Sequence, residues 1–252
     1  MNISFIYLLF GLILIHCSCR NRNDEQSIEN SINQHIQTQG ESLLKDYYTD
    51  GKIKTEGILI NGKKNGVWKE YASNGKIEKV NYYYKDTLIH KLDPLDFDLE
   101  TKILDDKSSI LLPKHWNIQE NYQQALVIAI KPKVFKPEIF NPTINVVKMF
   151  IPDSFTIEKI VELNIEEIKQ GVKEFKLKES VQVSKSTIPM IKALYFVDTG
   201  TQKLGAVSTY IQDKSTVYII TCLAQGNQLQ FVKYKDLFEE IVLSFKVSTP
   251  NV

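Results

Sequence analysis

The stretch Val217-Tyr-Ile-Ile-Thr-Cys-Leu-Ala224 is a run of β-branched, aromatic and other apolar residues, in which Thr221 carries the only aliphatic hydroxyl group. A short run of this kind is typical of a buried strand. Cys222 lies inside it, and we interpret this residue as part of a core, because a reactive thiol needs a polar, exposed setting. The elements on either side of the stretch determine how such a strand is covered.

Outward from this strand, the pattern over residues 108–248 alternates between strands and two helices. The strands are expected at 110–117, 124–130, 143–151, 176–184, 190–197, 204–211, 217–224 and 242–247. A helix with Asp153 or Ser154 as its N-cap is predicted from the helical spacing of Ile157, Ile160, Val161, Ile165, Ile168 and Val172. A second, shorter helix carries Phe231, Tyr234, Phe238 and Ile241 on one face. Because most connections are short, this order predicts an α+β fold with a mostly antiparallel sheet flanked by helices.

This part of the chain resembles the DcrB/PsbP/Mog1 group. The resemblance rests on the element order, on Asn141-Pro-Thr-Ile-Asn-Val-Val147, on Tyr218 to Ala224, and on residues 231–245 with their terminal Ser244-Phe245. It covers residues 108–248 and implies a sheet flanked by helices. Members of the group are mostly non-enzymatic, and they include lipoproteins and chaperones. The resemblance therefore implies a protein-binding or chaperone-like module.

Residues 40–95 contain an internal repeat with a period of 24 residues. Tyr47-Tyr-Thr-Asp-Gly-Lys-Ile53 aligns with Tyr71-Ala-Ser-Asn-Gly-Lys-Ile77. Turn dipeptides separate short β-branched and aromatic runs: Asp50-Gly51, Asn61-Gly62, Asn65-Gly66 and Asn74-Gly75. Because Asn-Gly and Asp-Gly suit tight hairpins, the pattern predicts a small antiparallel β-meander. Two copies have too little core to fold alone, so we expect this meander to pack on the larger domain.

The repeat resembles a known type. The segment from Glu56 to Tyr71, with its Asn-Gly-Lys-Lys-Asn-Gly-Val-Trp centre, is similar to the MORN-type repeat of the YwqK family. Proteins of that family are described as antitoxin components. The resemblance therefore implies hairpin repeats, and it gives an antitoxin or immunity protein as an alternative function.

The N-terminus resembles a bacterial lipoprotein signal. An apolar segment runs from Ile3 to Ile15 and leads into His16-Cys17-Ser18-Cys19. It is too short to span a bilayer comfortably and has the length of a signal-peptide core. We expect residues 1–19 to be the signal, with acylation at Cys17 or Cys19, and polar residues 20–39 to be a tether. The alternatives are a buried N-terminal helix and an uncleaved anchor.

Composition limits the partners. The chain has 252 residues, 43% of them hydrophobic and 24% charged, as in ordinary globular proteins. A formal net charge of +1 gives no general attraction to nucleic acid. The expected partners are a membrane, reached through the lipid anchor, and another protein or envelope component.

Catalytic and metal-binding motifs are not recognisable in the sequence. The histidines show no metal-ligand spacing, and there is no Gly-x-Ser-x-Gly motif. The loop from Asn61 to Gly66 is interpreted as a turn and not as a phosphate-binding loop. Glu158, Glu162, Glu166 and Glu167 lie opposite the apolar stripe of their helix, which indicates a solvated face. We therefore predict no catalytic, cofactor-binding or metal-binding residues.

An aromatic cluster in the repeats is the candidate binding surface. Its members are Trp68, Tyr71, Tyr82, Tyr83 and Tyr84. Strand alternation places Tyr82 and Tyr84 on one face and Tyr83 on the other. The alternative is that these aromatics only form the core of the repeats. Together these features predict a membrane-tethered, non-enzymatic lipoprotein of the cell envelope, with an envelope hydrolase as the remaining alternative.

Overall fold

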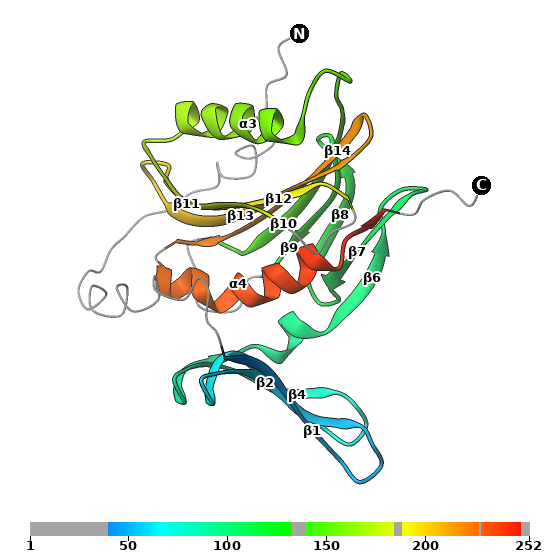
Figure 1. Ribbon diagram of the computed structural model, residues 1–252, viewed down its shortest axis with the longest axis vertical. Helices are drawn as coiled ribbons and strands as arrows, with labels where there is room; N and C mark the ends of the chain where they lie inside the picture. The colour runs from blue at the N-terminus through cyan, green and yellow to red at the C-terminus, as the bar shows by residue number, and fades with distance from the viewer. Residues whose placement is uncertain (1–39, 133–139, 184–187, 227, 248–252) are drawn as a thin grey trace.

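The computed structural model describes residues 40–132, 140–183, 188–226 and 228–247. They form three sheets, two α-helices and one short 3-10 helix (Figure 1). A five-stranded sheet lies below the main body, and helix α4 runs between it and a large seven-stranded sheet (Figure 1). The predicted signal, both candidate lipidation sites Cys17 and Cys19, and the predicted tether lie outside the described residues.

The five-stranded sheet is an antiparallel meander in chain order. Its strands are β1 (Glu41–Tyr47), β2 (Ile53–Ile60), β3 (Lys63–Tyr71), β4 (Ile77–Tyr84) and β5 (Thr87–Leu92). Strands β2 and β4 start 24 residues apart, as the repeat predicts. The turns that follow them share one geometry, because Asn61 and Gly62 have φ of 51° and 75°, and Lys85 and Asp86 have φ of 49° and 68°. The second turn keeps this geometry without a glycine.

The predicted turn at Asn65-Gly66 is wrong, since both residues lie inside β3. They belong to a bulge: Gly57 pairs with Trp68 and the next β2 residue, Ile58, pairs with Asn65. Gly66 and Val67 are therefore left without a partner on β2. The φ of +69° at Gly66 allows the bulge, because this conformation favours glycine.

The seven-stranded sheet has the order β11-β12-β13-β14-β10-β9-β8, and every neighbouring pair is antiparallel. The strands are β8 (Asn117–Tyr122), β9 (Ala125–Ile130), β10 (Thr143–Phe150), β11 (Glu174–Gln182), β12 (Met190–Asp198), β13 (Lys203–Asp213) and β14 (Thr216–Gln225). Helices α3 (Ile157–Gly171) and α4 (Gln228–Leu243) cover opposite faces (Figure 1). The predicted α+β class is confirmed.

Strand β14 lies between β13 and β10, and its alternating side chains enter two different cores. Tyr218, Ile220 and Cys222 pack on the α4 side. Val217, Ile219 and Leu223 pack on the α3 side. This double burial explains why the strand has no polar face. Cys222 is fully buried, as predicted.

The segment that links the two large sheets differs from the prediction. It forms η1 (Pro94–Phe97), β6 (Leu99–Ile103) and β7 (Ser108–Pro113), and β7 also pairs with the distant strand β15 (Lys246–Val247) to complete a small sheet. The single strand predicted over 110–117 is wrong: β7 ends at Pro113, and His115 lies in the turn before β8. The strand predicted over 242–247 is also too long, because α4 continues to Leu243.

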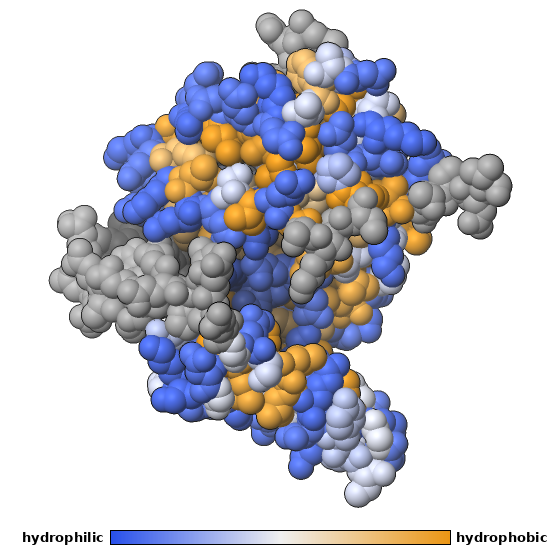
Figure 2. All heavy atoms as spheres, in the orientation of Figure 1, coloured by the Kyte–Doolittle hydropathy of each residue, from blue (hydrophilic) through white to orange (hydrophobic). Residues whose placement is uncertain are grey.

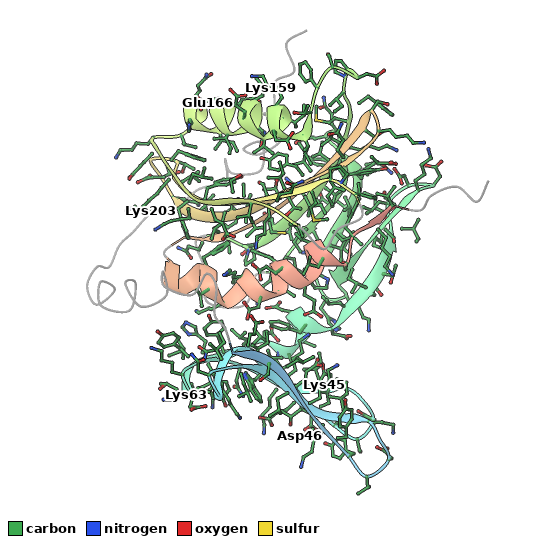
Figure 3. All side chains as sticks on the ribbon, viewed as in Figure 1. Lys45, Asp46, Lys63, Lys159, Glu166 and Lys203 are labelled. Carbon is green, nitrogen blue, oxygen red and sulfur yellow. The ribbon has the colours of Figure 1, made fainter. Side chains whose placement is uncertain are left out.

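Helix α3 follows the predicted apolar stripe, but its N-cap is Thr156 and not Asp153 or Ser154. The Thr156 hydroxyl accepts a hydrogen bond from the Lys159 amide at 3.4 Å. The opposite face is solvated, and Figure 3 shows Lys159 and Glu166 pointing away from the sheet. This placement agrees with a solvated role for the helix carboxylates.

Candidate functional site

The predicted aromatic surface is divided between the two faces of the five-stranded sheet. Tyr82 and Tyr84 face α4 and line a cleft. Tyr71 donates a hydrogen bond from its hydroxyl to Glu56 Oε1 at 2.5 Å and lines a smaller adjoining cavity. Trp68 and Tyr83 lie together on the outer face. The five residues therefore do not form one surface.

Trp68 packs within its own sheet and is only 3% exposed. Its ring lies over Gly57, where a Cβ atom would come within 2.3 Å of the indole. Tyr83 meets the ring edge-on at a centroid distance of 6.3 Å, and the Lys64 ammonium lies 4.4 Å from the ring centroid. All three neighbours belong to the same sheet, so Trp68 is a packing residue of the repeats.

Two polar contacts join the inner face of the sheet to α4. The Val67 amide donates to Asp236 Oδ2 at 2.9 Å, and Lys69 Nζ lies 2.8 Å from Glu240 Oε2. The first contact depends on the β3 bulge, which leaves the Val67 amide without a β2 partner. Gly66 makes room for the carboxylate, since a Cβ atom there would lie 2.9 Å from Asp236 Oδ2. The bulge thus allows the sheet to pack on α4 through the hydrogen bond between Val67 and Asp236.

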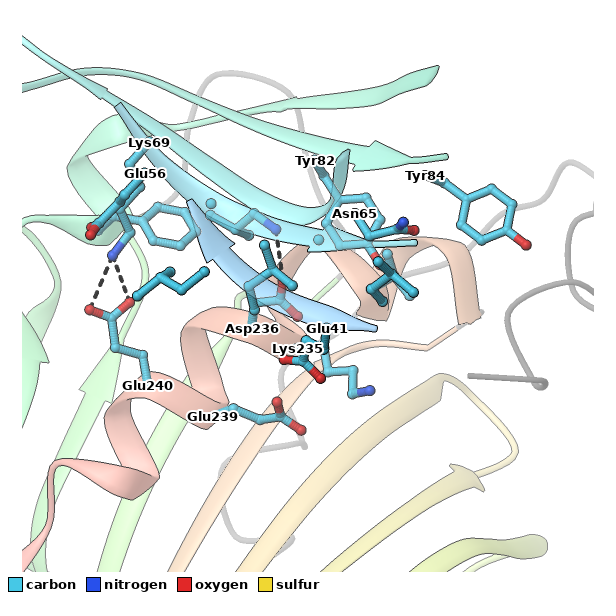
Figure 4. Close-up of a pocket in the computed structure, with 18 residues that line it drawn as sticks. Glu41, Glu56, Asn65, Lys69, Tyr82, Tyr84, Lys235, Asp236, Glu239 and Glu240 are labelled. Carbon is cyan, nitrogen blue, oxygen red and sulfur yellow. Dashed lines mark hydrogen bonds and ion pairs between the residues drawn. The ribbon is translucent and has the colours of Figure 1, made fainter. Parts of the chain in front are cut away.

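The space beside these contacts is a cleft of about 480 Å³ between the sheet and α4 (Figure 4). Its apolar lining comes mainly from the sheet: Leu43, Ile58, Ile60, Val67, Tyr82, Tyr84, Phe97 and Val232. Its charged lining is mostly acidic: Glu41, Glu56, Asp236, Glu239 and Glu240, against Lys69 and Lys235. Figure 2 shows the surface hollowed between sheet and main body, with hydrophilic residues along the visible part of the hollow.

Most charges in the cleft are already paired. Glu240 pairs with Lys69, Glu239 with Lys192 at 3.0 Å, and Glu56 with Lys45 at 3.4 Å. Glu41 makes no ion pair among the described residues. It projects from β1 beside Leu43, which is 64% exposed. The β1 side of the cleft therefore offers a free carboxylate next to an exposed apolar side chain.

Asp236 is the perturbed carboxyl of the cleft. Burial raises its pKa from 3.8 to about 6, assisted by the negative charges of Glu239 and Glu240, while the Val67 amide and Lys235 act in the opposite direction. The desolvation of the charged form therefore exceeds the stabilisation that the single amide provides.

Replacing Asp236 with Asn tests this assignment through pH. A folded-state pKa above the unfolded value means that the native protein binds the proton first, so stability rises as pH falls from about 7 to about 4. The asparagine side chain would keep an acceptor for the Val67 amide without the charge. We expect Asp236→Asn to be more stable than the wild type by roughly 2–3 kcal/mol at pH 7, and the difference to vanish near pH 4.

Urea denaturation at several pH values measures both effects. Asp153→Asn, at an exposed position before α3, is the matched control and should leave the pH profile unchanged. An Asp236→Asn variant that is less stable than the wild type at pH 7 would show that the charged carboxylate is favourable, against the assignment.

A second buried polar cluster ties η1 to the main body. Asp96 accepts hydrogen bonds from Trp116 Nε1 at 2.9 Å and from Lys131 Nζ at 2.6 Å. The Asp96 and Lys131 side chains are 6% and 13% exposed. Because the carboxylate is enclosed and satisfied on both oxygens, we assign this cluster a structural role.

Within the described ranges, no three His, Cys, Asp or Glu side chains gather as a metal site. Neither described helix has the length and apolarity needed to cross a membrane.

Comparisons with known proteins give structural likeness only. No family model and no curated protein matches the chain. A Mog1 protein structure has a TM-score of 0.48 at 12% identity, over 60% of this chain and 97% of that one. The cyanobacterial PsbP of Synechocystis has a TM-score of 0.46 at 15% sequence identity, over 59% of this chain and 92% of that one. LpqN, involved in cell envelope biogenesis of Mycobacterium tuberculosis, has a TM-score of 0.45 at 9% sequence identity, over 67% of this chain and 99% of that one. With TM-scores below 0.5, these likenesses carry no argument about function.

Sequence reasoning did not identify the α4 side of the cleft. Asp236, Glu239 and Glu240 lie at spacings of three and four residues, which places them on one face of a helix. That spacing was a usable signal. However, nothing local shows that this face meets Val67, 169 residues away in the sequence.

Proposed function

We propose that the protein is a membrane-tethered, non-enzymatic interaction module of the cell envelope, and that the cleft between the five-stranded sheet and α4 holds a segment of a partner protein. The cleft carries this proposal, because it combines an apolar lining with a few charged groups at its border. Its position also fits: β1 borders the cleft and begins at Glu41, two residues after the end of the predicted tether, residues 20–39.

The membrane part of the proposal rests on the sequence resemblance at Cys17 and Cys19. A lipid anchor at either residue would hold the folded part at a membrane and leave the cleft available. The antitoxin alternative also comes from a resemblance, and no residue of the cleft favours it over another protein partner.

The hydrolase alternative has one observation in its favour, the raised pKa of Asp236. A general acid must reach a reacting group. Asp236 Oδ2 instead receives the Val67 amide, and the neighbouring Glu240 is paired with Lys69. We therefore propose that these carboxylates dock the sheet and shape the cleft.

Photo-crosslinking in native membranes tests the proposed function. Leu43 borders the cleft, and Leu163 on α3 is a matched exposed leucine, at 64% and 39% exposure. With p-benzoylphenylalanine in place of Leu43, we expect one reproducible protein adduct, identified by mass spectrometry. The same group in place of Leu163 should not form it. Identical adducts from both positions, or none from Leu43, would refute a partner site in the cleft.

A further inference from the structure

The outer edge of β1 is open among the described residues. Strand β1 ends the sheet order, and within the part of the chain that the structure describes it pairs only with β2. Six of its seven residues are exposed, including Leu43 at 64% and Tyr47 at 56%. An edge strand of this length with exposed apolar side chains is a template for pairing with another strand.

The register of β1 on β2 shows which of its side chains face the cleft. Glu41 pairs with Ile60, Leu43 with Ile58, and Lys45 with Glu56. Because Ile58, Ile60 and Glu56 line the cleft, their partners on β1 point to the same face. A strand added to β1 would therefore place alternate side chains over the cleft, opposite Glu41 and Leu43.

Charge complementarity indicates what that strand carries. Lys45 is engaged by Glu56, whereas Glu41 makes no ion pair among the described residues. The other charged groups that line the cleft are predominantly carboxylates. A basic side chain opposite Glu41 would complete a cross-strand pair, whereas Glu56, Glu239 and Glu240 already have lysine partners.

We propose that an extended peptide segment of a partner protein binds as a sixth strand on the free edge of β1, with Lys or Arg opposite Glu41 and an apolar side chain opposite Leu43. Main-chain hydrogen bonds supply affinity in this mode, and the alternate side chains supply specificity. The motif is thus a basic and an apolar residue two positions apart. This inference rests on the proposed function and specifies its partner.

Fluorescence anisotropy with a labelled heptapeptide tests the charge. The probe carries Lys and Val two positions apart on a Thr background, and a second probe carries Glu in place of Lys. We expect the full chain to prefer the Lys probe by roughly tenfold, and Glu41→Lys to abolish or reverse the preference. Glu41→Gln should give an intermediate result. Glu162→Lys, on the solvated face of α3, is the control and should leave it unchanged.

Backbone methylation of the Lys probe tests the strand pairing. In a strand, alternate amides point to the same side, so only one set can pair with β1. Methylating one set of alternate amides should abolish binding, and methylating the other set should not. Equal binding of both methylated probes, or a charge preference unaffected by Glu41→Lys, overturns the proposal. If the Leu43 adduct still forms, the proposed function remains.

Two other occupants of the edge have distinct outcomes. A gain in probe affinity of about tenfold or more on removal of residues 20–39 would assign the edge to the chain's own preceding segment. Self-association that the probe competes away would assign it to a second copy. Either result overturns the assignment to a separate partner.

Discussion

Replacing Lys131 with Met is expected to lower the free energy of unfolding by about 3–5 kcal/mol. Lys131 Nζ lies 2.6 Å from Asp96 Oδ2, and the Asp96 side chain is 6% exposed. Methionine matches the length of the lysine stem but leaves the buried carboxylate with Trp116 as its only side-chain donor among the described residues. The cost comes from the unpaired charge and not from lost packing. Urea denaturation measures the change.

The matched control is Lys114→Met. Lys114 also forms an ion pair, with Asp98 at 2.6 Å, but both side chains are far more exposed, at 42% and 39%. Such a pair contributes about 0–1 kcal/mol. Adding Asp96→Asn to Lys131→Met should restore part of the stability, because the charge is removed and an acceptor for Trp116 remains. Equal losses for Lys114→Met and Lys131→Met would contradict the structural role of the buried cluster.

Replacing Gly57 with Ala is expected to cost roughly 3 kcal/mol, at the upper end of the range for overpacking a core. The new Cβ atom would lie 2.3 Å from the Trp68 ring, which is only 3% exposed. Either the indole leaves its position over β2 or the two strands separate. Both responses disturb the sheet that forms one wall of the cleft. Thermal unfolding followed by circular dichroism measures the loss.

A double variant separates steric conflict from other effects of the substitution. Trp68→Leu alone loses buried area, but in the Gly57→Ala background it should recover stability, because the clash disappears. The two changes are thus expected to be strongly non-additive. Additive losses would show that Gly57 is not required by the indole.

The main elements of the fold were predictable where local pattern and burial agree. The apolar stripe of α3 reflects burial on one face of the helix. The continuous apolar run of β14 reflects burial on both faces of the strand. The turn at Asn61-Gly62 was predictable because Asn and Gly tolerate the positive φ values that both residues adopt. Strand β6 was missed because Leu99-Glu-Thr-Lys-Ile103 is mostly polar, and its pairing with β7 stabilises it.

The site was predictable only in part. Strand alternation predicted that Tyr82 and Tyr84 share one face of the candidate binding surface, and both residues line the cleft. Asn65 and Gly66 form a bulge in β3 and not the predicted turn, and this bulge brings the Val67 amide to Asp236. A bulge depends on pairing across strands, and docking depends on contacts distant in sequence. Neither has a local pattern, so the α4 side of the cleft required the structure.

Amide hydrogen exchange of the full chain, with and without the Lys heptapeptide, tests the strand-addition site most directly. Outward-facing amides of an unpaired edge strand exchange rapidly, and a new strand protects them. We predict that the probe slows exchange in residues 41–47, with smaller protection at the cleft-facing part of α4, and that Glu41→Lys removes the effect. Binding of the probe without protection of residues 41–47, or with protection at the β8 or β11 edge instead, would contradict strand addition at β1.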